Sequence, residues 1–107
     1  MVRKLALLWV LFAAACAAPT LPLPPPETDV GPPNEFGIVE VQGTGAAARS
    51  ICICVNTNTD EVEGTYAEAD GTFLVEIAAS VNDELECWYQ DGFDVSQISY
   101  DTVPPAE

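Results

Sequence analysis

Over the last two thirds of the chain, apolar residues recur at every second position in short runs, and this alternation is the strongest constraint on the fold. Leu85, Cys87 and Tyr89 fall on one face of a strand over 84–90. A period of two is typical of a β-strand that buries one face. No stretch shows the 3.6-residue period of an amphipathic helix, so the sequence predicts an all-β domain.

Further strands of the same kind are expected between turn residues. Their ranges are 37–42, 50–56, 64–69, 72–78 and 97–103. The strand over 72–78 places three apolar side chains toward the core, namely Phe73, Val75 and Ile77, while Leu74 and Glu76 fall on its outer face. Strands at this spacing predict a single antiparallel β-sandwich over 36–103, with a short tail over 104–107.

The charges divide the chain into two unequal parts. Lys and Arg number 3 against 17 Asp and Glu, and Arg3 and Lys4 lie at the very start. Without them the chain keeps Arg49 against 17 carboxylates, a net charge of −16. Nucleic acids and anionic membrane surfaces bind through clustered cations and are therefore excluded as partners. The chain has no histidine, which excludes imidazole catalysis and His-ligated metal sites.

Residues 1–15 have the three regions of a bacterial export signal. Arg3 and Lys4 are followed by an apolar run over 5–12 and then by three alanines. This run is far shorter than the roughly 20 residues that span a bilayer. The small residues directly before Cys16 resemble the lipobox of bacterial lipoproteins, although alanine stands at position 13, where that family usually has leucine.

The lipobox resemblance implies cleavage before Cys16 and acylation of its thiol and new amino group. Three acyl chains exceed what stable membrane anchoring requires. Ala17 follows the cysteine in place of aspartate, which implies delivery to the outer membrane by enteric-type sorting. The alternative is a simple secretory signal that is cut after Ala15 or slightly later and leaves Cys16 unmodified or lost.

Seven of the nine prolines lie between Pro19 and Pro33. Such a run prefers extended polyproline II and forms neither a helix nor a central strand. At about 3.1 Å per residue it spans roughly 50 Å. The sequence therefore predicts a tether over 16–35 and a domain boundary near Glu35.

Several turn motifs resemble the bacterial Ig-like domains of surface and adhesin proteins. The Asp70-Gly71 pair, typical of a hairpin turn, stands two residues before Phe73. The other matching positions are Asp83, Leu85, Asp91, Gly92 and Ser96. The resemblance covers nearly all of 37–103 and implies an Ig-like sandwich. Transthyretin-like domains share the first of these motifs and remain the alternative.

Three cysteines belong to the predicted domain. In the strand over 50–56 we expect the branched aliphatic residues in the core, namely Ile51, Ile53 and Val55. Cys52 and Cys54 then point away from the core, whereas Cys87 points into it. A disulfide between Cys87 and either of the other two requires a bulge that shifts the register.

An exported protein enters an oxidising compartment, where disulfides form. Because three is an odd number, one thiol stays unpaired or pairs between chains. We expect a disulfide from Cys87 to Cys52 or Cys54 first, then free thiols, then a dimer link. A metal site comes last, because three thiolates without histidine are too few for a closed zinc site.

Two further groups of residues are candidates for binding. Asp70, Asp91 and Asp94 lie in turns and are weak candidates for calcium, although no Asp-x-Asp-x-Asp-Gly loop is present. Otherwise they belong to a solvated acidic surface. Trp88, with Tyr66 or Leu74, is the candidate contact patch, because exposed aromatic side chains favour partners.

Taken together, these features predict a non-enzymatic lipoprotein of the bacterial envelope that displays one Ig-like binding or structural module. We expect a membrane contact through the lipid anchor, an envelope protein or polysaccharide as partner, and no cofactor. The alternative is a secreted, calcium-assisted accessory or adhesion domain of the same fold.

Overall fold

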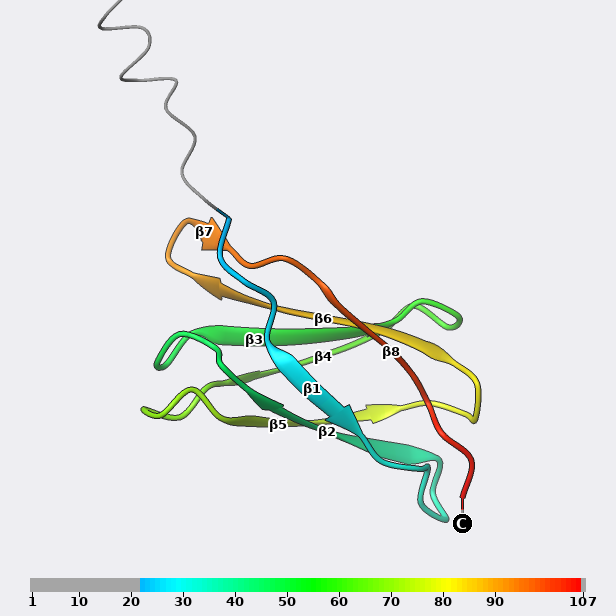
Figure 1. The fold of residues 1–107 in the computed structure, drawn as a ribbon. Helices are drawn as coiled ribbons and strands as arrows, with labels where there is room; N and C mark the ends of the chain where they lie inside the picture. Colours follow the sequence, from blue (N-terminus) through cyan, green and yellow to red (C-terminus); the bar gives the residue numbers. More distant parts are fainter. Residues whose placement is uncertain (1–21, 107) are drawn as a thin grey trace, which may run out of the picture.

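The computed structural model describes residues 22–106, which form two antiparallel β-sheets packed into a sandwich (Figure 1). The smaller sheet has the order β1-β2-β5, from Glu27–Val30, Ile38–Thr44 and Phe73–Ala78. The larger sheet has the order β4-β3-β6, from Glu61–Tyr66, Ile51–Asn56 and Glu84–Asp91; both β7 (Asp94–Val95) and β8 (Ser99–Thr102) pair with β6. The predicted all-β sandwich is confirmed.

The core lies between the two sheets and is built from alternate residues of four strands. The predicted inward rows of β5 and β6 are confirmed: Phe73, Val75, Ile77, Leu85, Cys87 and Tyr89 are all buried. Val39 and Val41 of β2 lie beside the β5 row in the smaller sheet and have no exposed surface. The alternation identified these rows because, on both strands, the alternate residues are charged or more exposed and point to the other side of the sheet.

Strand β3 faces the opposite way from the prediction. Its inward row is Cys52, Cys54 and Asn56, each with 0% of its surface exposed, whereas Ile51 is 41% exposed. The prediction that the aliphatic row faces the core is therefore wrong. Cys54 lies directly opposite Cys87 in the register, so the two share the inner face without a bulge. Both rows of β3 carry apolar residues, the cysteines in one and the branched aliphatics in the other, and the alternation alone does not distinguish them.

Part of the proline-rich segment belongs to the fold. β1 pairs with β2 along its whole length. Its Thr28 hydroxyl donates to Asp101 and lies 2.6 Å from the Ser99 hydroxyl, which ties β1 to β8 across the edge of the sandwich. The prediction of a free tether over 16–35 is therefore wrong for the described part of that range.

The prolines flank β1 without interrupting it. Pro24, Pro25 and Pro26 precede the strand and Pro32-Pro33 follows it, so no ladder hydrogen bond falls on a proline nitrogen. Further toward the N-terminus, Gln97 N donates to the carbonyl of Leu23 at 2.9 Å. The folded domain thus begins at residue 23, ahead of the predicted boundary.

The Asp70-Gly71 turn does not close a hairpin. The strands on either side, β4 and β5, belong to different sheets. The turn itself is tight: Gly71 N donates to Glu68 O at 3.0 Å, and Gly71 has a φ of +86°. The hairpin prediction is wrong because this dipeptide determines only the local path of the chain, whereas strand pairing depends on more distant contacts.

Beyond β8 the chain runs as irregular structure from Pro104 to Ala106. Within residues 22–106 no helix has the length and apolar character needed to cross a membrane.

Candidate interaction surface

The outer face of the larger sheet carries apolar side chains from all five of its strands. Residues opposite one another in an antiparallel register point to the same side, and Ile53 lies opposite both Trp88 and Gly64. The same register assigns the other members. We call this set the apolar sheet face: Ile51, Ile53, Val55, Val62, Tyr66, Trp88, Val95 and Tyr100.

This face is open to solvent in the monomer. Tyr100 is 72% exposed, Tyr66 70% and Val62 56%, while Ile53 and Trp88 are half-buried among their neighbours. Gly64 presents no side chain to Ile53, which leaves part of that isoleucine uncovered. Two polar side chains share the face: Glu86 lies between Val55 and Tyr100, and Gln90 lies between Ile51 and Val95. Exposed apolar side chains gathered on one face mark an interaction site more often than single exposed residues do.

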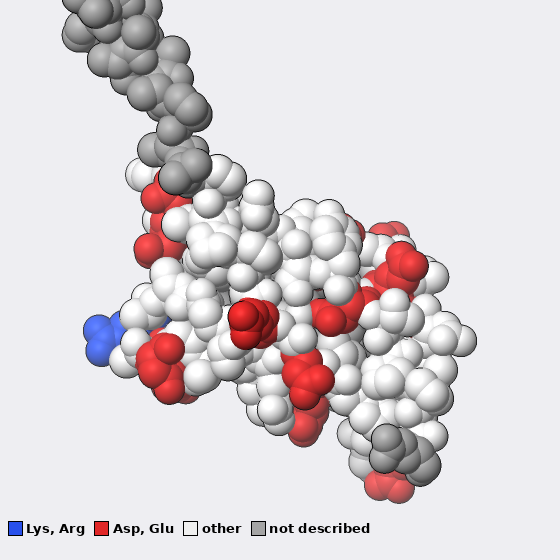
Figure 2. Space-filling view, viewed as in Figure 1, with Lys and Arg blue, Asp and Glu red and all other residues white. Residues whose placement is uncertain are grey.

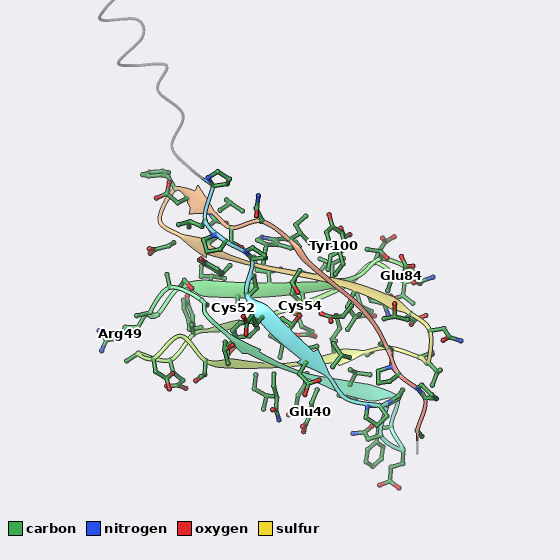
Figure 3. All side chains as sticks on the ribbon, viewed as in Figure 1. Glu40, Arg49, Cys52, Cys54, Glu84 and Tyr100 are labelled. Carbon is green, nitrogen blue, oxygen red and sulfur yellow. A yellow bond between two sulfur atoms is a disulfide. The ribbon has the colours of Figure 1, made fainter. Side chains whose placement is uncertain are left out.

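The outer face of the smaller sheet has the opposite character. We call its four carboxylates the acidic sheet face: Glu27, Asp29, Glu40 and Glu76. Glu40 and Glu76 lie directly opposite each other in the register of β2 and β5. In Figure 3 Glu40 lies outside the smaller sheet, on the other side of the molecule from Glu84 and Tyr100.

Positive charge is nearly absent from the described chain. Arg49 is the single Lys or Arg within residues 22–106, and it precedes β3 in a turn. Figure 2 shows carboxylates spread over the visible surface and one basic side chain, at the place where Figure 3 labels Arg49. The two outer faces therefore differ in apolar character while the domain as a whole is strongly negative.

A hollow of 420 Å³ adjoins the apolar sheet face between β6 and β8. Tyr100 forms part of its wall, together with Glu84 and Glu86; Asp101 also borders it, but its carboxylate accepts the hydrogen bond from Thr28. Sequence reasoning missed this group, because Glu84 and Tyr100 come together only through the pairing of β6 with β8. An aromatic ring beside carboxylates is a favourable environment for a cationic side chain.

The predicted contact patch is divided between the two outer faces. Trp88 and Tyr66 belong to the apolar sheet face, whereas Leu74, 47% exposed, lies on the outer side of the smaller sheet. Tyr66 and Leu74 nevertheless border one hollow of 440 Å³ around the β4–β5 edge. The structure thus places Tyr66 with Trp88 on one face and with Leu74 along one edge.

The cysteines lie inside the sandwich, and none of the three in the described range is exposed. Of the pairings left open by the sequence, the structure has Cys54–Cys87, with 4.2 Å between the Cα atoms. Cys52 is free and buried. Burial raises the pKa of its thiol, against a smaller lowering by the hydrogen bond to Ser50. A buried thiol with a raised pKa is a poor nucleophile.

The three aspartates proposed for calcium do not form one group. The carboxylate of Asp70 accepts hydrogen bonds from the Thr72 hydroxyl at 2.7 Å and the Thr72 amide at 3.1 Å, and these lower its pKa. Asp91 and Asp94 pair with each other at the β6–β7 turn. In the described part of the chain no three His, Cys, Asp or Glu side chains are placed to share a metal ion.

Compared with known protein families, curated proteins and solved structures, the chain matches none of them. The export signal over 1–15 and the lipidation site Cys16 lie outside the described residues.

Proposed function

We propose that this protein is a non-enzymatic lipoprotein of the bacterial envelope, delivered to the outer membrane, that displays one Ig-like sandwich as a binding module. The observation that carries the binding role is the apolar sheet face, exposed on a domain that is otherwise acidic. Contiguous apolar surface costs solubility and is retained where a partner covers it.

The strand order supports the Ig-like assignment. Ig-type sandwiches place their second strand beside the fifth in one sheet and the third beside the sixth in the other, and variable-type domains add a further strand next to the third. Here β2 pairs with β5, β3 pairs with β6, and β4 adds to β3. One feature departs from antibody domains: the disulfide joins neighbouring strands of one sheet and does not bridge the two sheets.

The lipobox-like sequence before Cys16 supports the anchor, and the position of β1 changes its geometry. Because Leu23 is already bonded to the domain, the residues over 17–22 separate it from the modified cysteine. Six residues reach at most roughly 22 Å. The sandwich would then stand close to the membrane, with the β7 end nearest to it (Figure 1).

The intact mass of the mature protein from its native envelope, measured without reduction, tests the anchor. We expect a chain from Cys16 to Glu107 that carries a diacylglycerol and an acyl group and lacks two hydrogens for the disulfide. Cys16→Ser is the matched variant and is expected to lose both the lipid and membrane retention. An unacylated chain that starts at Cys16 or further on would overturn the lipoprotein proposal.

A further inference from the structure

We propose that the apolar sheet face docks a cationic protein partner, whose surface has an apolar centre bordered by Lys and Arg side chains. The inference deepens the binding role proposed above and rests on it. It commits to a class of partner and to one face of the sandwich. Three properties of that face carry it: its apolar content, its neighbouring carboxylates and its lack of cations.

Strand β3 carries apolar side chains on both of its faces. Its inner row is fully buried, and its outer row is also apolar, with Ile51, Ile53 and Val55. Strands with apolar residues on both rows are typical of sheets that are covered on both sides. In the monomer the outer row is only partly covered, and Ile51 remains 41% exposed. A partner that packs on this face would supply the second cover.

Carboxylates lie within and beside the same face, since Glu86 stands between Val55 and Tyr100 in the register. Glu84 and Glu86 point outward on β6, in the same row as Trp88, and line the hollow beside Tyr100. The hollow offers an aromatic ring and carboxylates to an incoming Lys or Arg, which favours charge-assisted hydrogen bonds and a cation–π contact. No residue of the described chain supplies a cation to this hollow, since Arg49 lies in the turn before β3.

A protein fits these features better than the other occupants. A second copy would bring its own charge of −16 against the first, with Glu84 and Glu86 at the contact. A polysaccharide stacks on aromatic rings, whereas most of this face is β-branched aliphatic. Those members are Ile51, Ile53, Val55, Val62 and Val95. Aliphatic side chains at the centre of a contact are typical of protein–protein interfaces.

Site-specific photocross-linking of the full chain in its native envelope tests the inference. The photoreactive residue p-benzoylphenylalanine replaces Tyr100 or Val62 on the apolar sheet face, and Glu40 on the acidic sheet face serves as control. We expect the first two positions to cross-link to the same protein, at a peptide that contains Lys or Arg beside apolar residues. Position 40 is expected to give no such adduct.

Two charge variants with the same change in net charge sharpen the test. Glu84→Gln with Glu86→Gln is expected to lower the adduct yield from Tyr100 on the order of tenfold, because the cationic side chains lose their partners. Glu40→Gln with Glu76→Gln removes two charges from the acidic sheet face and is expected to change the yield by less than about twofold.

The inference is overturned by any of four results: adducts only with a second copy of this chain, adducts with polysaccharide, adducts to a peptide without basic residues, or none from Tyr100 and Val62. The anchor is scored separately in the same cells by the acylation of Cys16. An acylated protein without adducts leaves the anchor standing and removes the docking surface. An unacylated protein with the expected adducts does the reverse.

Discussion

Asn56 Nδ2 donates a hydrogen bond to Asp83 Oδ2 at 2.8 Å, from the end of β3 to the loop before β6. The same amide nitrogen lies 3.2 Å from the carbonyl of Ala78, at the end of β5 in the other sheet. Asn58 N donates to the remaining amide oxygen at 3.0 Å. One fully buried side chain therefore connects the two sheets at this end of the sandwich.

Replacing this amide is expected to destabilise the domain and reverse its response to pH. Asn56→Ala leaves the Ala78 carbonyl without its donor and is expected to cost about 2–3 kcal/mol in free energy of unfolding. In Asn56→Asp the introduced carboxylate faces Asp83, so stability is expected to fall further as the pH rises above about 4. Urea denaturation between pH 3 and 8 measures both effects.

In the unmodified protein, stability is expected to fall as the pH is lowered, which is the opposite of the trend expected for Asn56→Asp. The hydrogen bond from Asn56, followed by that from the Ser80 amide, lowers the pKa of Asp83 below its ordinary value of 3.8. Such a carboxylate contributes stability that is present above its unfolded pKa and is lost as the pH falls toward the folded pKa. A pKa of Asp83 at or above 3.8 by NMR titration would contradict this interpretation.

The Cys54–Cys87 disulfide is expected to be a major source of stability. The two cysteines are 33 residues apart in sequence, and closing a loop of that size contributes about 2–4 kcal/mol by restricting the unfolded chain. We expect the double variant Cys54→Ala, Cys87→Ala to have a free energy of unfolding lower by that amount, as measured by urea denaturation.

Cys52→Ala serves as the control, with an expected cost of about 1 kcal/mol for a small cavity. Thiol titration of the intact protein in buffer should detect no reactive group in the described domain and one after unfolding. Rapid labelling of Cys52 in buffer would contradict its burial. An unchanged urea midpoint after reduction of the protein would contradict the stabilising role of the Cys54–Cys87 disulfide.

Gly43 and Phe73 lie opposite each other in the register, with the aromatic ring over the glycine backbone. A Cβ at position 43 would overlap that ring, so Gly43→Ala is expected to cost about 1–3 kcal/mol through displaced core packing. Gly31→Ala is the matched control, because its nearest contact, Glu40 O, is at 3.8 Å. Its effect should stay within about 0.5 kcal/mol.

A double-variant cycle with Phe73→Leu identifies the contact. If the ring causes the clash, the cost of Gly43→Ala should shrink by more than about 0.5 kcal/mol in the Phe73→Leu background. Equal costs in both backgrounds would assign the effect to the backbone.

The pair Glu40–Glu76 is expected to destabilise the smaller sheet, since like charges directly opposite in a register repel. Glu76→Lys should raise the free energy of unfolding by about 0.5 kcal/mol at low salt, and less at high salt. Glu63→Lys is the control: it makes the same change in charge, but the residue opposite it in the register is Cys54 and not a carboxylate. An equal gain from both variants would point to net charge and not to the pair.

Alternation in the sequence was sufficient to identify the buried row of β5 and β6, whose other rows contain charged residues. Phe73, Val75 and Ile77 alternate with Leu74 and Glu76, and the inward row was identified correctly. The same reasoning failed for β3, whose cysteines and aliphatic residues are equally suited to a core. It also missed β1, because the surrounding prolines dominate the local composition while the four residues of the strand are free of them.

The sequence by itself determined the all-β class, the acidic character and the inward rows of β5 and β6, because these depend on local alternation and on counts of charge. The tertiary structure decided the face of β3, the choice of Cys54 as the partner of Cys87, and the inclusion of β1 in the smaller sheet. It also assembled the apolar sheet face and the hollow beside Tyr100. The physical reason is common to all of these: strand register joins residues that are far apart in the chain, and a local pattern carries no information about that pairing.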